Sequence, residues 1–233
     1  MDGTLLDLLE QQAAEHRDKA LYSFFDRRLS VSQTLSFESL YLRSRRFAGV
    51  LQHAHCDARP VLLYCPHGPG FLIAFFACVM AGAWPVPVTR HRAQSDTGLA
   101  LLLRASGADT VVTTDSRLAH LPPALSKSGV RVLSVDTATG QCHSYQRPVL
   151  TSDDTAFIQY TSGSTSSPKG VMISHANVLH NAGTICRAFA CGSDDIGVSW
   201  LPFHHDMGLI GHIITPLYVG LHNYFLSPLD FVA

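Results

Sequence analysis

Residues 160–170 read YTSGSTSSPKG, a run with six serine and threonine residues, two glycines and Lys169, one of only three lysines in the chain. Short apolar segments with the composition of β-strands lie on both sides, at 156–160 and 171–174. A flexible Ser/Gly linker would have a similar composition, but linkers rarely lie between two strands in close succession. We therefore interpret this run as a loop inside a strand–loop–strand unit.

The residue types in this loop suit the binding of a phosphate. Glycine lets successive backbone N–H groups turn toward an anion, hydroxyls donate hydrogen bonds without adding charge, and a lysine adds a compact positive charge. A P-loop requires Lys-Ser/Thr followed by a helix, whereas Lys169 precedes Gly170 and then a strand-like run. The GxSxG motif of serine hydrolases is absent. The loop predicts a phosphate site of another kind.

The rest of the chain alternates between helical and strand-like patterns. Helices are expected at 4–16, from the N-cap Ser36 to 51, and at 71–81, 97–106, 175–189 and 209–218; strands are expected at 61–64, 86–88, 110–113, 130–135, 196–201 and 223–226. This alternation predicts an α/β fold with a mainly parallel sheet flanked by helices. The polar stretch 137–155 is interpreted as a surface connection and a possible subdomain boundary.

One segment could be mistaken for a membrane span. No Asp, Glu, Lys or Arg occurs between Val61 and Thr89, but prolines and glycines interrupt this segment and leave 14 uninterrupted residues at 71–84. About 20 apolar residues are needed to cross a bilayer. We therefore expect a buried core helix and no transmembrane segment.

Composition narrows the class of protein. The 233 residues include 46% hydrophobic residues, and 17 basic residues nearly balance 18 acidic ones. This excludes a disordered charged tail and gives no indication of nucleic acid as a partner. Six cysteines without a CxxC pair suit a reducing compartment. No signal peptide is evident after Met1, so we expect a cytoplasmic protein.

The run His204-His205-Asp206 is the second candidate for chemistry. Three adjacent residues in a loop cannot easily converge on one metal ion, and the HHxxxDG motif of condensation enzymes would need the aspartate three residues further along. A structural role, in which one or both histidines cap or bridge loop groups, remains open.

Both runs resemble known signatures. Residues 161–170 resemble the phosphate-binding signature [ST]SG[ST]TGxPKG of the adenylate-forming superfamily, except at Ser166, where the family commonly has glycine. Residues 198–211, VSWLPFHHDMGLIG, are similar to the VSWLPxxHDMGLIG run of fatty acyl-AMP ligases, and residues 71–88 resemble another region of that subfamily. The chain is identified by this resemblance as the N-terminal portion of a fatty acyl-AMP ligase.

The resemblance implies a reaction and the residues that perform it. A fatty acid carboxylate would attack the α-phosphorus of ATP to give acyl-AMP and pyrophosphate, and the acyl group would pass to an acyl carrier protein or a polyketide synthase. The implied phosphate-binding residues are Thr161, Ser162, Gly163, Ser164, Thr165, Lys169 and Gly170, with Mg²⁺ next to Thr165. Lys169 and His205 are the expected catalytic residues. The acyl-site candidates are His205, Asp206, Met207 and Gly208, and the apolar run 208–218 is either a wall of the acyl site or an ordinary core helix.

The family also carries adenine-binding, ribose-binding and small C-terminal segments downstream, and none of these is found before Ala233. We therefore expect a partial AMP-binding domain that is inactive alone. Two alternatives remain open: a long-chain acyl-CoA synthetase, and a shortened, non-catalytic module that binds a nucleotide or an acyl group.

Overall fold

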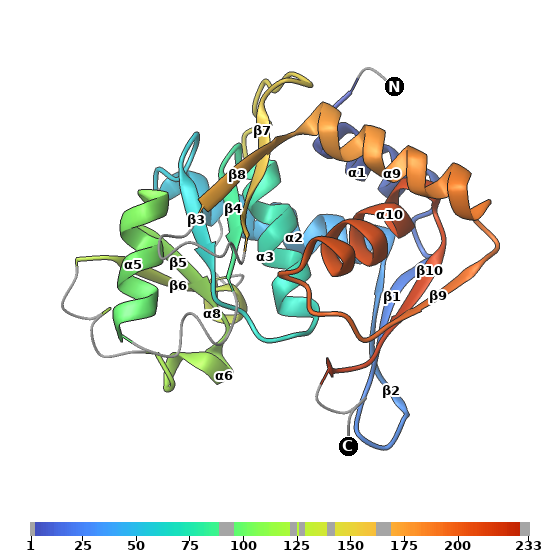
Figure 1. Cartoon of the computed structure of the whole chain (residues 1–233), viewed down its shortest axis with the longest axis horizontal. Coiled ribbons are helices and arrows are strands. Elements are labelled where there is room, and N and C mark those ends of the chain that lie inside the picture. The colour runs from blue at the N-terminus through green and yellow to red at the C-terminus, as the bar shows by residue number, and fades with distance from the viewer. Residues whose placement is uncertain are drawn as a thin grey trace.

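The computed structural model of the chain describes residues 3–88, 96–121, 125, 129–138, 143–161 and 169–228. Within these residues the strands form three sheets, with the orders β2-β1-β10-β9, β4-β3-β5-β6 and β7-β8 (Figure 1). The strands are β1 (Ala20–Phe25), β2 (Val31–Ser36), β3 (Pro60–Leu63), β4 (Trp84–Pro87), β5 (Thr110–Thr113), β6 (Arg131–Ser134), β7 (Thr155–Thr161), β8 (Lys169–Ser174), β9 (Ile196–Ser199) and β10 (His222–Phe225). The β4-β3-β5-β6 sheet is parallel throughout.

Helices fill the space between and around the sheets. They are α1 (Leu5–Glu15), α2 (Phe37–His53), α3 (Pro69–Ala81), α5 (Asp96–Ser106), α6 (Asp115–Leu118), α8 (Val135–Ala138), α9 (His175–Phe189), the π-helix η1 (Met207–Ile214) and α10 (Thr215–Val219). The expected α/β class with a mainly parallel sheet is confirmed, and so are the N-caps Ser36 and Ser174. No helix in the described ranges is long and apolar enough to cross a bilayer.

Two parts of the fold differ from the sequence-based expectation. The β1–β2 hairpin was not predicted, because most of β2 is polar and exposed; its turn is closed by Asp26 Oδ1, which accepts the N–H groups of Arg28 and Ser30. The helix expected at 209–218 is also wrong at its start, since the segment before residue 209 contributes Met207 and Gly208 to η1. The reason is that the Leu209 N–H donates to the His205 carbonyl, so helical hydrogen bonding begins inside that segment.

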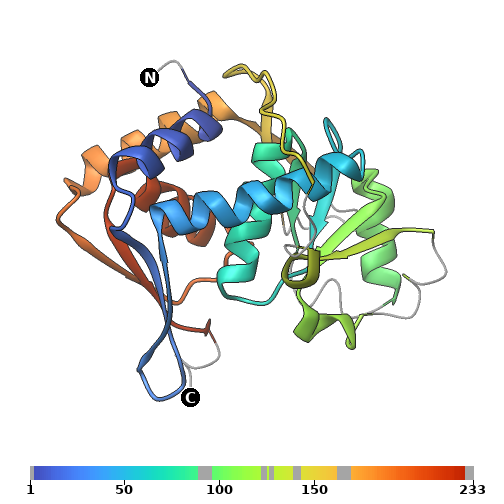
Figure 2. The ribbon, with the colours of Figure 1, turned by 180° about the vertical axis from the view of Figure 1, so that it is seen from behind.

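Helix α3 occupies the centre of the molecule. It begins at Pro69, which suits a first turn, and it ends at Gly82 in the left-handed conformation with φ +72°. Every residue from Phe71 to Ala81 is at most 3% exposed. The two four-stranded sheets lie on opposite sides of this helix (Figure 1), and α2 crosses it on the side seen in Figure 2. The expected buried core helix is therefore confirmed.

Two aromatic side chains of α3 bind neighbouring segments to it. Phe75 packs edge-on against Phe157 of β7, with ring centroids 5.8 Å apart. Phe71 packs against Phe203, with centroids 5.4 Å apart. Phe203 in turn stacks on His67, at 3.7 Å. One helix thus fixes both β7, which leads into residues 161–170, and the segment that leads into residues 204–206.

A buried histidine joins the start of α1 to the start of α9. The His175 Nδ1 atom accepts the N–H of Leu5 at 3.1 Å. Burial lowers the pKa of His175 to about 4 and that of His67 to about 4. Both side chains are therefore neutral in the folded protein at neutral pH.

We predict that stability falls as the pH is lowered from about 6.5 toward 4. In this window the unfolded chain binds more protons than the folded one, which costs about 1.4 kcal/mol per pH unit for each such histidine. Urea unfolding at pH 7.5, 6 and 5 would measure the slope. His175→Gln should lower the slope of unfolding free energy against pH by the contribution of one bound proton, about 1.4 kcal/mol per pH unit. His180→Gln, on the exposed face of α9, should leave the slope unchanged. Equal slopes in the two variants would contradict this account.

Truncation of Phe203 tests the aromatic attachment to α3. Phe203 is 3% exposed, so Phe203→Ala should lower the free energy of unfolding by about 3–5 kcal/mol. Phe189→Ala is the matched control, because Phe189 is 80% exposed and its loss should cost no more than about 0.5 kcal/mol. Urea unfolding of both variants gives the two values. Losses of similar size would show that the Phe203 ring is not a core contact.

Candidate functional site

The ends of the predicted phosphate loop are held together by β7 and β8. These strands pair in antiparallel register, with Thr161 opposite Lys169 and Tyr160 opposite Gly170. Gly170 is required by packing, since a Cβ atom there would lie 2.9 Å from the Tyr160 ring. The expected strand–loop–strand unit is thus confirmed at both of its strands. The residues between them, 162–168, lie outside the described residues, and with them Ser162, Gly163, Ser164 and Thr165.

Lys169 is the first residue of β8 and its side chain is exposed. Its strand position is fixed by the pairing with Thr161 across β7. A lysine at this end of the loop can extend its ammonium group toward an anion held by the loop residues.

The second candidate run is attached to the first by a side chain that the sequence analysis did not single out. Gln159 of β7 is 9% exposed, and its Nε2 atom donates to the carbonyl of His204 at 3.1 Å. Gln159 lies one residue before Tyr160, so the hydrogen bond joins the two motif-bearing segments directly. The sequence does contain an indication of this role, since Gln159 is a polar residue inside the apolar run 156–160.

The imidazoles of the second run lie in different environments. His204 is half-buried, and burial together with the neighbouring His205 lowers its pKa. His205 is exposed, and its Nδ1 atom lies 2.6 Å from Oδ1 of Asp206. The same carboxylate oxygen accepts the N–H of Met207 at 2.7 Å. Asp206 therefore both begins η1 and orients the exposed imidazole.

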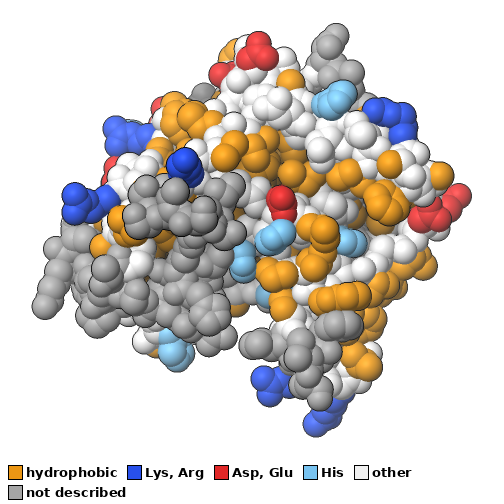
Figure 3. Space-filling model, in the orientation of Figure 1, with side chains coloured by type: hydrophobic (Ala, Val, Ile, Leu, Met, Phe, Trp, Pro, Cys, Tyr) orange, Lys and Arg blue, Asp and Glu red, His pale blue; other side chains and the backbone are white. Residues whose placement is uncertain are grey.

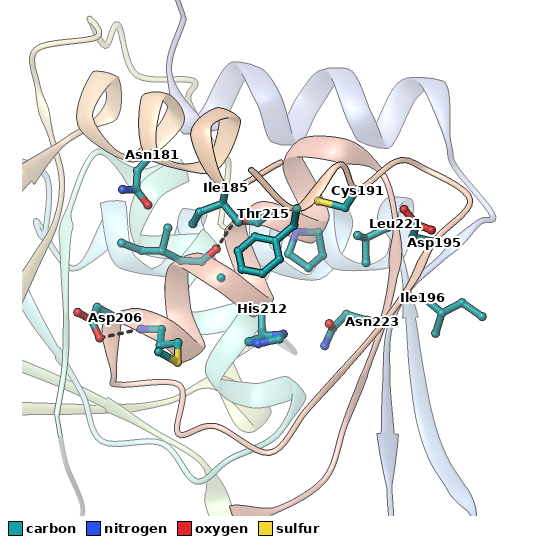
Figure 4. Close-up of a pocket in the computed structure, with 16 residues that line it drawn as sticks. Asn181, Ile185, Cys191, Asp195, Ile196, Asp206, His212, Thr215, Leu221 and Asn223 are labelled. Carbon is teal, nitrogen blue, oxygen red and sulfur yellow. Dashed lines mark hydrogen bonds between the residues drawn. The ribbon is translucent and has the colours of Figure 1, made fainter. Parts of the chain in front are cut away.

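A pocket of about 670 Å³ begins beside this run. It lies between α9, η1 and the β9–β10 edge of the first sheet, and Asp206 lies at one end of it (Figure 4). Its apolar lining includes Ile185, Phe189, Ile196, Met207, Ile210 and Leu221. Figure 3 shows histidine and hydrophobic side chains gathered near the middle of the corresponding face. The N–H of Thr215 donates to the carbonyl of Ile210, five residues earlier, which is the hydrogen-bond spacing of a π-helix.

The predicted acyl-site residues thus divide into three groups. Asp206 and Met207 line the pocket, and His205 is their exposed neighbour. Gly208 is buried and packs against Pro202, whose carbonyl oxygen would lie 2.2 Å from an added Cβ. His212 and Asn223 also line the pocket. The sequence analysis missed these two, although each is a polar residue within an apolar run.

Metal binding finds limited support among the described residues. No group of three or more His, Cys, Asp or Glu side chains in that part of the chain is arranged to hold a metal ion. The residue expected next to Mg²⁺, Thr165, belongs to the stretch that the structure does not describe. Asp206, the carboxylate of the second candidate run, already accepts a backbone hydrogen bond.

Comparison with known proteins gives a consistent family. The chain is 33% identical to the medium-chain-fatty-acid–[acyl-carrier-protein] ligase JamA of Moorena producens, over 98% of this chain and 40% of that protein. It is 30% identical to the corresponding ligase TtuA of Teredinibacter turnerae, over 99% of this chain and 43% of that protein. The chain therefore spans less than half the length of these relatives.

Solved structures agree with the sequence relatives. A fatty acyl-adenylate ligase from L. pneumophila, in complex with acyl adenylate and pyrophosphate, superposes with a TM-score of 0.88 at 32% identity. The match covers 98% of this chain and 40% of that one. The family model described as AMP-binding enzyme matches residues 9–232. The chain therefore belongs to the AMP-binding enzyme family.

Proposed function

We propose that this chain is the part of a fatty acyl-AMP ligase that brings the phosphates of ATP and a fatty acid together. The acid carboxylate attacks the α-phosphorus, and pyrophosphate leaves as acyl-adenylate forms. The observation that carries this proposal is the Gln159–His204 hydrogen bond, because it joins the strand before the phosphate loop to the segment at the pocket entrance. The names and bound ligands of the relatives support it.

Holding two anions in one place is the main physical task of such a site. Lys169 and Gly170, with Thr161, Ser162, Gly163, Ser164 and Thr165, are proposed to bind the phosphates. The Lys169 ammonium offsets the negative charge that builds on the departing pyrophosphate. His205, oriented by Asp206, is proposed to position the carboxylate against the α-phosphate.

The pocket beside Asp206 and Met207 is proposed to hold the acyl chain. Its volume of about 670 Å³ lies in the range of small-molecule sites, and each buried methylene adds about 0.8 kcal/mol of binding free energy. The run 208–218, which forms most of η1 and most of α10, then serves as a wall of this site and as core packing at once.

Three further features complete the proposal. Mg²⁺ keeps most of its waters and binds substrate phosphates, so one protein oxygen, that of Thr165, suffices to hold it with ATP. The acceptor of the acyl group is an acyl carrier protein, as the names of two relatives state for those proteins, or a carrier domain of a polyketide synthase. The reaction takes place in the cytoplasm, a reducing compartment that suits the five free cysteines among the described residues.

Substitution of Lys169 tests the phosphate site. In the longest natural protein that contains this chain, Lys169→Ala should lower kcat/KM for decanoate-dependent ATP–pyrophosphate exchange by about 10²–10³-fold, because a charged transition-state contact is lost. Arg28→Ala is the matched charge control, on a hairpin far from β7 and β8 (Figure 1), and should leave the rate unchanged. Exchange by Lys169→Ala at the rate of the Arg28→Ala control would remove Lys169 from the site.

A further inference from the structure

Two polar side chains lie side by side in the mainly apolar lining of the pocket. His212 comes from η1 and Asn223 from β10, and Figure 4 shows them next to each other. The other polar lining residues are accounted for without a ligand. Asn181, Asp195 and Asp206 are exposed, and the Thr215 hydroxyl donates to the Ile210 carbonyl at 2.8 Å.

Asn223 is completely buried. Its Nδ2 atom donates to the Tyr224 carbonyl at 3.2 Å, while its Oδ1 atom accepts no well-aligned hydrogen bond from a described residue. The strand pairing makes room for this amide. Asn223 lies opposite Gly197 of β9, where a Cβ atom would come within 2.1 Å of Oδ1. A buried, under-satisfied amide costs about 1–3 kcal/mol, so its presence here calls for an explanation.

His212 is the side chain beside that amide. The ring is half-buried, and burial lowers its pKa, although the nearby Asn223 side chain partly opposes this effect. A neutral imidazole has one donor and one acceptor nitrogen. The ring lies beside the Asn223 amide and also lines the pocket, so it can meet a polar group of a molecule held there.

The charge around this pair selects the kind of group that it can bind. The two lining carboxylates, Asp195 and Asp206, are exposed and already accept backbone N–H groups, at 2.7 Å in each case. None of the described lining residues is a buried charged side chain. The charge of an ammonium or a carboxylate group placed beside His212 would therefore not be balanced. A neutral group that both donates and accepts, such as a hydroxyl, matches a neutral imidazole.

We propose that this pocket selects carboxylic acids that carry a hydroxyl group along their chain, with His212 as the hydrogen-bond partner of that hydroxyl and Asn223 as the positioning residue of His212. This inference rests on the proposed function, because it specifies the acid that the acyl site receives. An unsubstituted chain would cover the His212 nitrogen with methylene groups and leave it without a partner, a loss that a hydroxyl avoids.

The test compares decanoic acid with the positional isomers of hydroxydecanoic acid in ATP–pyrophosphate exchange by the longest natural protein that contains this chain. At least one isomer should exceed decanoic acid by about 10-fold in kcat/KM. His212→Phe should abolish this preference, and His212→Gln should retain part of it. Ile210→Val, an apolar change in the same pocket, should retain all of it. Asn223→Val should reduce the preference by raising KM for the hydroxylated acid more than for decanoic acid.

The possible results separate the two proposals. Exchange with decanoic acid but no preference for any hydroxylated isomer would overturn this inference and leave the proposed function intact. A preference that survives in folded His212→Phe would overturn the role of His212. No exchange with any acid would instead refute the proposed function. If His212→Phe fails to unfold cooperatively in urea, the His212→Gln variant decides, since a preference equal to the wild type would then count against the role of His212.

Discussion

The burial of helix α3 on all sides is the constraint on which the rest of the structure depends. A helix without a polar face must be covered everywhere, and here the helices α2, α1 and α8 and the strands β3, β4 and β5 pack against it. Two of its aromatic rings also contact other segments: Phe75 packs against Phe157 of β7, and Phe71 packs against Phe203. Strand β7, which precedes the candidate phosphate loop, and Phe203, which precedes the His204–Asp206 run, are thus packed against the same helix, although about 40 residues separate them in the sequence.

This shared anchor explains how a loop rich in glycine and serine can still take part in a defined site. A phosphate-binding loop needs conformational freedom so that its backbone N–H groups can turn toward phosphates. The strands at its two ends do not need this freedom. The β7–β8 register places Lys169 opposite Thr161, and Gln159 donates to the His204 carbonyl. We propose that the elements beside the loop supply the preorganisation that a reaction between two anions requires.

The sequence predicted what local patterns determine. The capped helices after Ser36 and Ser174, the buried helix before Gly82 and both strands around residues 162–168 follow from periodicity, caps and composition. The β1–β2 hairpin did not follow, because β1 is stabilised by parallel pairing with β10, about 200 residues away. The Gln159–His204 contact and the His212–Asn223 pair also depend on tertiary neighbours, and no spacing rule brings such residues together.

The most direct test of the account is a crystal structure of the longest natural protein that contains this chain, bound to a non-hydrolysable decanoyl-adenylate analogue with a sulfamate in place of the phosphate. The account predicts that the sulfamate lies between Lys169 and His205. It also predicts that the acyl chain passes Met207 into the pocket between α9 and η1. An acyl chain that leaves the adenylate in another direction, with this pocket empty, would contradict the account.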